Sequence, residues 1–143
     1  MKNLLILLLI SINTAAFSQT EQFISLIQQT KQSYLDRGYS LVDESSASIL
    51  TGEPLVTPLL NLEYNTYYIV LVQVDGCIYC SYEVNYVDEN EFLLPVDFEF
   101  IMENNLKQAL YKFQNDLNKK GKFVVFLESD LPYYVNIFVF KKS

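Results

Sequence analysis

Two cysteines separated by two residues are the part of the sequence best suited to chemistry. Cys77 and Cys80 are the only cysteines in the chain. In an exported protein an isolated pair predicts a local disulfide, whereas a redox-active pair usually places a low-pKa thiol at the N-terminus of a helix. The residues after Cys80 alternate as in a β-strand, which favours the structural disulfide. A thiol-disulfide or redox-sensing role is the alternative.

The absence of histidine removes several other kinds of chemistry. It excludes histidine-based triads, most proton shuttles at neutral pH and nearly all zinc or copper sites built on imidazole. Zinc on Cys77 and Cys80 would need two further thiolate or imidazole ligands, which the chain lacks, and haem attachment would need histidine in place of Ser81. Asp88, Asn90 and Glu91 offer oxygen ligands, but their spacing matches no complete calcium loop, which predicts a solvated turn. We therefore expect no catalytic residue, no metal ion and no cofactor.

One pair of carboxylates merits a separate test. Glu83 together with Asp97 or Glu99 could form a glycosidase pair, because carboxylates on adjacent strands can lie about 5 to 9.5 Å apart. These three carboxylates alternate with apolar residues, and on such strands the polar positions normally form the solvent-exposed face. The pattern favours that simpler interpretation over catalysis.

Aromatic residues offer a candidate binding surface. The segment 133–140 carries large side chains on both faces, and one of these faces holds Tyr134, Phe138 and Phe140. A strand needs only one face for a core, so the other must be covered by a helix, a partner or a ligand. Cover by the N-terminal helix is the favoured prediction. If that face is open, these three residues become the expected contact with a protein or a glycan.

The first 18 residues have the features of a secretory signal peptide. Lys2 gives a positive start, an apolar run follows, and Ala16-Phe17-Ser18 is a small-x-small cleavage site. The apolar run is shorter than the roughly 20 residues that span a bilayer. We expect a secreted or periplasmic protein with one domain, 19–143, and no membrane span.

Charge narrows the choice of partner. The net charge of −7 becomes −8 without Lys2 (9 basic against 17 acidic residues), and the chain has no extended basic patch. Nucleic acids bind to clustered Lys and Arg, so we expect no nucleic-acid partner.

The periodicity of the chain predicts one helix followed by strands. Apolar residues recur at helical spacing over 20–37, with Thr20 as N-cap, and 66–90 reads as a β-hairpin that turns at Asp75-Gly76. Further strands are expected at 39–42 and 46–50 (or as one bent strand), 55–62 at a sheet edge because of Pro58, 96–100, 123–127 and 133–140.

The segment 106–117 fits two patterns. Leu106, Ala109, Leu110, Phe113 and Leu117 have helical spacing, although the alternation at 109–114 also suits a strand. Short strands separated by turns predict a mainly β protein, an antiparallel β-sandwich at 39–142 preceded by the helix. The alternative is an α+β fold in which a helix at 103–118 lies on an open antiparallel sheet.

The order of several short motifs resembles small secreted bacterial β-sandwich domains of the pre-peptidase C-terminal, jelly-roll-like type. The matching pieces are Leu50-Thr51-Gly52, Leu62 with Tyr68-Ile69-Val70, Cys77 to Cys80, Asp88-Glu89-Asn90, and Gly121 to Val125. The resemblance implies that 108–114 is a strand and that the domain is a noncatalytic accessory or binding module.

Two departures from this pattern matter. Relatives often carry aspartates after the cysteine turn, where this chain has Ser81-Tyr82-Glu83-Val84, so no cation site is carried over. Glu91 replaces the glycine expected at the end of the Asp88 turn. The resulting hypothesis is an exported noncatalytic binding protein with an unknown protein or glycan partner. Redox sensing is the alternative, and a carbohydrate-binding or carbohydrate-active protein is the third possibility.

Overall fold

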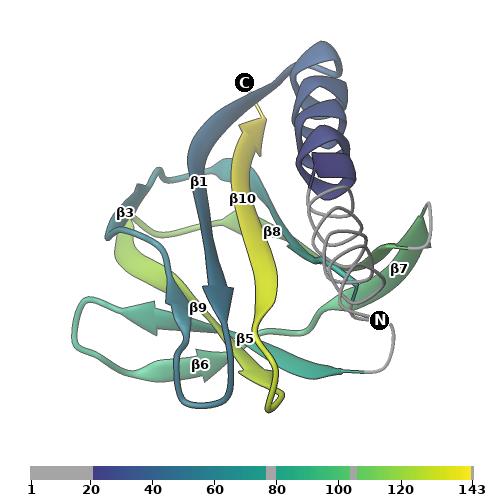
Figure 1. Cartoon of the computed structure of the whole chain (residues 1–143). Coiled ribbons are helices and arrows are strands. Elements are labelled where there is room, and N and C mark those ends of the chain that lie inside the picture. The colour runs from purple at the N-terminus through teal and green to yellow at the C-terminus, as the bar shows by residue number, and fades with distance from the viewer. Residues whose placement is uncertain (1–20, 77–79, 104–105, 143) are drawn as a thin grey trace, which may run out of the picture.

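The protein is mainly β, with two antiparallel sheets and, in the part of the chain described, one helix that precedes them (Figure 1). The computed structural model describes residues 21–76, 80–103 and 106–142, so the predicted signal peptide at 1–18 and Thr20 lie outside the described residues. The helix occupies residues 21–36. The antiparallel sandwich predicted from the sequence is thereby confirmed. Among the described residues, no helix has the length and apolar character needed to cross a membrane.

Each sheet is built from strands that are distant in the sequence. The first sheet has the order β1 (Tyr39–Ile49), β10 (Tyr133–Lys142), β4 (Thr66–Val74), β8 (Leu106–Asn115) and β7 (Glu99–Glu103). The second has the order β2 (Leu55–Val56), β9 (Lys119–Glu128), β5 (Ser81–Asp88) and β6 (Leu93–Pro95), and β3 (Leu60–Leu62) also pairs with β9.

The main core lies between the two sheets. Alternate residues of β4 and β10 face inward, such as Val70, Val72 and Ile137, and they meet Val84 and Val125 of the second sheet. All five are almost completely buried. Burial of each such side chain stabilises the fold by roughly 1.5 to 3 kcal/mol, so the period-two pattern supplies most of the driving force.

A second core lies between the helix and the outer face of the first sheet. Phe23, Ile27 and Tyr34 share one side of the helix and pack in the cluster that contains Phe138 and Phe140. Tyr34 stacks on Phe140 with ring centroids 4.8 Å apart. The predicted cover by the helix is confirmed, and it explains why β4 and β10 are apolar on both faces.

The predicted hairpin at 66–90 is wrong, because its two strands belong to different sheets. β4 pairs with β10 and β8, whereas β5 pairs with β9 and β6. After Gly76, with φ at 66°, the chain has enough length before Ser81 to cross the roughly 10 Å between packed sheets. Two strands that are both rich in apolar residues gain more from facing one another across a core than from pairing side by side.

The segment 106–117 forms strand β8, not a helix. It pairs along its length with β4, for example Leu110 with Leu71 and Phe113 with Tyr68, and it also pairs with β7. These two ladders outweigh the local helical spacing, which is a weak preference compared with tertiary contacts. The alternative α+β fold with a helix at 103–118 is therefore wrong.

Three smaller expectations changed in detail. The first strand is one bent strand, β1, with a bulge between Leu41 and Asp43. The segment 55–62 does lie at a sheet edge, but it is divided into β2 and β3, in which Val56 is exposed and Leu60 is buried. The strand expected at 96–100 is wrong for 96–98, since β6 ends at Pro95 and β7 begins at Glu99, and it is right only for Glu99 and Phe100. Residues 96–98 cross from one sheet to the other.

Candidate functional site

The aromatic face of β10, which would be a ligand surface only if it were left open, is closed. Phe138 and Phe140 have no exposed surface, because the helix covers them. Tyr134 is half-buried, its ring lies edge-on to Phe23 at 5.8 Å, and its hydroxyl donates a hydrogen bond to Ser46. The contacts that would have served a ligand are made by the chain itself, so this face is not an open binding surface.

Of the cysteine pair, the structure describes Cys80. Cys77 lies outside the described residues, and Cys80 is half-buried against the main core just before β5. The disulfide and the alternative redox role both stay predictions.

The acidic turn after β5 uses its carboxylate internally. Asp88 Oδ1 accepts hydrogen bonds from the backbone N–H groups of Asn90 and Phe92, both at 2.9 Å. Glu91 completes this turn with φ at 64°, in the left-handed region where glycine was expected. Across the described ranges there is no group of three or more Cys, Asp or Glu side chains placed to hold a metal ion.

The suggested glycosidase pair is not assembled. Glu83 and Asp97 both border one cavity, but Glu99 does not. Glu83 is exposed and alternates with buried Tyr82 and Val84, so its side chain points to the outer face of the second sheet. The two carboxylates therefore do not face one another across the cavity.

That cavity is part of an opening between the sheets, which we call the inter-sheet cleft. It consists of two hollows of about 280 and 210 Å³ that share Val96 as a wall. The first is lined by residues that include Tyr82, Asn85, Asp97, Phe98 and Phe100, and the second by residues that include Tyr86, Tyr111, Phe113, Asn115, Lys119 and Phe123.

The shortness of β6 explains why the cleft exists. β6 pairs only with Asn85, Tyr86 and Val87, and its last residue, Pro95, has no N–H with which to continue the ladder. The edge of β5 before Asn85 is therefore left uncovered by β6. The chain then crosses to β7 and leaves a gap at this side of the sandwich.

Aromatic rings form much of the wall of the cleft. Tyr82 and Phe100 meet edge-to-face with centroids 5.5 Å apart, and Phe98 lies 5.7 Å from Tyr111. Tyr111 in turn stacks on Phe113 at 4.8 Å. Phe100 is 52% exposed, so one ring remains available at the mouth. Such a wall suits a ligand with apolar faces.

Two phenol hydroxyls in the cleft are buried without a hydrogen-bond partner, those of Tyr82 and Tyr86. Tyr82 is only 6% exposed. A buried polar group left in this state costs roughly 1 to 3 kcal/mol. Burial raises the pKa of Tyr82, and burial together with Asp88 and Glu89 raises the pKa of Tyr86. Both hydroxyls therefore keep their proton at neutral pH and can donate and accept hydrogen bonds.

One cation and one carboxylate lie beside these rings. Lys107 Nζ is 4.7 Å from the centre of the Phe100 ring and 5.4 Å from that of Tyr82. The Asp97 carboxylate raises the pKa of Tyr111, after the larger effect of burial. The cleft thus combines rings, hydroxyls and charges of both signs, since Glu83 also borders the first hollow and Lys119 lines the second.

Sequence reasoning did not find this cleft. Tyr82, Phe98 and Phe100 alternate with polar residues, and this alternation predicts half-buried strands without indicating a gap between two sheets. The useful signals were the proline at 95 and the aromatic residues that follow it.

Comparisons with known proteins add little. No family model matches the chain, and no curated protein matches it, so the resemblance to pre-peptidase C-terminal domains stays a prediction. Among solved structures, the chain is similar to the CBM22-1 and GH10 modules of Clostridium thermocellum endo-1,4-β-D-xylanase 10B in complex with xylohexaose. The identity is 10%, the TM-score is 0.41, and the match covers 74% of this chain and 26% of that one.

It is also similar to the CBM22-1 xylan-binding domain of Paenibacillus barcinonensis Xyn10C, with 10% identity, a TM-score of 0.40 and coverage of 74% and 87%. The chain thus spans about a quarter of the first of these two structures. Similarity this low carries no argument about what this chain binds.

Proposed function

We propose that the protein is an exported, noncatalytic β-sandwich that binds a glycan in the inter-sheet cleft. The observation that carries the proposal is the pair of buried, unpartnered hydroxyls of Tyr82 and Tyr86 in a cleft walled by aromatic rings. Ligand sites are typically concave and mainly apolar, with a few polar groups that orient the ligand.

The chemistry of the cleft suits a sugar. The C–H faces of a pyranose ring pack on aromatic rings such as Phe100, and its hydroxyls can both donate to and accept from tyrosine hydroxyls. The Asp97 carboxylate adds an acceptor. Lys107, close to the same rings, disfavours a cationic ligand because it places a positive charge at that point.

The test is binding to a panel of neutral polysaccharides, followed by titration calorimetry with oligosaccharides of the best one. Tyr82→Phe removes only the hydroxyl, and loss of one hydrogen bond should weaken binding about 5- to 10-fold. Phe100→Ala removes the exposed ring and should weaken binding by a similar factor or more. Phe92→Ala is the matched control, because Phe92 is 67% exposed and lies in the turn before β6.

Stability separates a binding role from a structural one. Tyr82→Phe should leave the free energy of unfolding unchanged or raise it, since it removes an unsatisfied buried group. Absence of binding to the whole panel, or equal affinities for wild type, Tyr82→Phe and Phe100→Ala, would overturn the proposal.

A further inference from the structure

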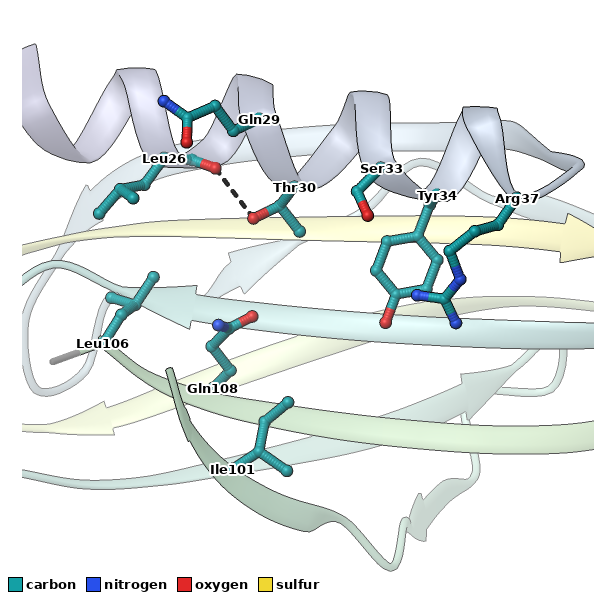
Figure 2. Close-up of a pocket in the computed structure, with 9 residues that line it drawn as sticks. All are labelled: Leu26, Gln29, Thr30, Ser33, Tyr34, Arg37, Ile101, Leu106 and Gln108. Carbon is teal, nitrogen blue, oxygen red and sulfur yellow. Dashed lines mark hydrogen bonds between the residues drawn. The ribbon is translucent and has the colours of Figure 1, made fainter. Parts of the chain in front are cut away.

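A second hollow lies between the helix and the β7–β8 side of the first sheet, and we call it the helix groove (Figure 2). Its volume is about 300 Å³, at the lower end of the range for small-molecule sites. Thr30, Ser33 and Arg37 line it from the helix side, and Gln108 and Ile101 line it from the sheet (Figure 2). It lies on the opposite face of the first sheet from the inter-sheet cleft.

An amide network lies at the floor of this groove. Gln73, which has no exposed surface, donates from Nε2 to Thr30 Oγ1 at 3.2 Å and to Gln108 Oε1 at 3.3 Å. The Thr30 hydroxyl donates in turn to the carbonyl of Leu26 at 2.9 Å (Figure 2). Both hydrogens of the Gln73 amide are therefore used, and the direction of the network is fixed.

The network leaves one acceptor open. Gln73 Oε1 is buried and has no hydrogen-bond partner. Both partners of its Nε2 line the groove, which places this amide directly behind the groove floor. Gln73 itself does not line the groove, so a ligand there meets this network through Thr30 and Gln108, which do.

The other end of the groove presents a cation. Arg37 is the only arginine in the sequence. Its guanidinium lies 4.7 Å from the centre of the Tyr34 ring and 5.8 Å from that of Tyr39. Within the described residues it forms no ion pair, since the pairs found there join Lys31 to Glu44 and Lys141 to Glu63.

The lining contains no Asp or Glu, although the chain as a whole is acidic. A guanidinium matches a carboxylate in a bidentate geometry, and a charge-assisted hydrogen bond is stronger than a neutral one. The groove therefore offers a carboxylate site at Arg37, and the side chains of Ser33 and Thr30 line the same groove with hydroxyl groups.

We propose that the helix groove binds a small polyhydroxylated carboxylic acid, such as a sugar acid, with its carboxylate on Arg37 and its hydroxyls on the side chains of Ser33 and Thr30. This site is independent of the glycan site proposed for the inter-sheet cleft, because the two share no lining residue.

The experiment compares D-glucuronate with D-glucose by titration calorimetry on the mature protein. The two probes differ only in the carboxylate, so glucuronate should bind at least about tenfold more tightly. Arg37→Gln should reduce the affinity for glucuronate about 10- to 100-fold. Lys31→Gln is the matched control, because it removes a cation from the same helix outside the groove lining and should change the affinity less than twofold.

A third variant tests the groove without disturbing the core. Ser33→Ala changes an exposed lining residue and should weaken glucuronate binding severalfold with no change in unfolding. Equal affinity for the two probes, an equal loss in Arg37→Gln and Lys31→Gln, or a crystal soaked with glucuronate that shows only water beside Arg37 and Ser33 would overturn the proposal. Tyr82→Phe should leave glucuronate binding intact, which separates a failure here from a failure of the cleft.

Discussion

Gly121 in β9 offers a sharp test of how the second sheet is packed. The ring of Tyr86, on the neighbouring strand β5, lies directly over this glycine, and a Cβ at position 121 would overlap its Oη, Cζ and Cε2 atoms. The backbone of Gly121 is not in the left-handed region, so alanine is allowed there by φ. The whole cost of Gly121→Ala should therefore come from the Tyr86 ring.

The magnitude follows from two opposing effects. Overpacking a close contact costs typically about 1 to 3 kcal/mol. Replacing glycine by alanine in an allowed conformation gains roughly 0.4 to 1 kcal/mol, because the unfolded chain loses freedom. We expect Gly121→Ala to destabilise the protein by about 1 to 2 kcal/mol, a large part of the margin of an ordinary domain.

Removing the outer part of the Tyr86 ring should abolish the destabilisation that Gly121→Ala causes. In a Tyr86→Leu background the overlapping atoms are gone while apolar bulk remains against Phe123, so Gly121→Ala should be neutral or slightly stabilising. Urea unfolding of the four proteins gives the coupling free energy, which we expect to be about 1 to 3 kcal/mol. An equal cost of Gly121→Ala in both backgrounds would refute the reasoning, since the ring would then not be the cause.

Three other changes have defined outcomes. Glu91→Gly should raise the free energy of unfolding by about 1 kcal/mol, because φ at 64° disfavours residues with a Cβ; Glu91→Ala keeps the strain and should show no such gain in the same urea assay. Burial raises the pKa of Tyr82, so the folded protein keeps this proton after the unfolded chain has lost it. The free energy of unfolding is therefore unaffected by this group below about pH 10 and falls as the pH rises further, by up to about 1.4 kcal/mol per pH unit. Tyr82→Phe should make the free energy of unfolding fall less steeply between pH 9 and pH 11. Asn115→Ala should cost about 2 to 3 kcal/mol, because its buried Nδ2 donates to three backbone carbonyls; a change in melting temperature within error would contradict the assigned bonds.

Much of the architecture followed from local pattern. Alternation along 66–74, 123–127 and 133–140 predicted strands that the structure contains, and the apolar stripe of 20–37 predicted a helix that packs on a sheet. These features are readable because side-chain direction depends only on positions along one chain segment. Pro58 likewise indicates a sheet edge from the sequence alone, because proline lacks the N–H that a central strand would need.

Other features depended on partners that no local pattern specifies. The residues of β8 fit a helix by spacing, and only pairing with β4 and β7 makes them a strand. The residues of β4 and β5 fit a hairpin, and only the competition for neighbours in two sheets separates them.

The candidate site depends entirely on such contacts between distant segments. The inter-sheet cleft exists because β6 ends early and the crossover at 96–98 spans a gap, which brings Tyr82 beside Phe100. The helix groove is lined by Thr30 and Arg37 from the helix side and by Ile101 and Gln108 from the sheet, which are far apart in the sequence. The sequence by itself determined the β-rich class, the inward faces of most strands and the covering helix, since these depend on the direction of side chains within one segment. Only the tertiary structure decided which strands are neighbours and where the sandwich stays open. Strand pairing and packing depend on which contacts between distant segments are the most stable.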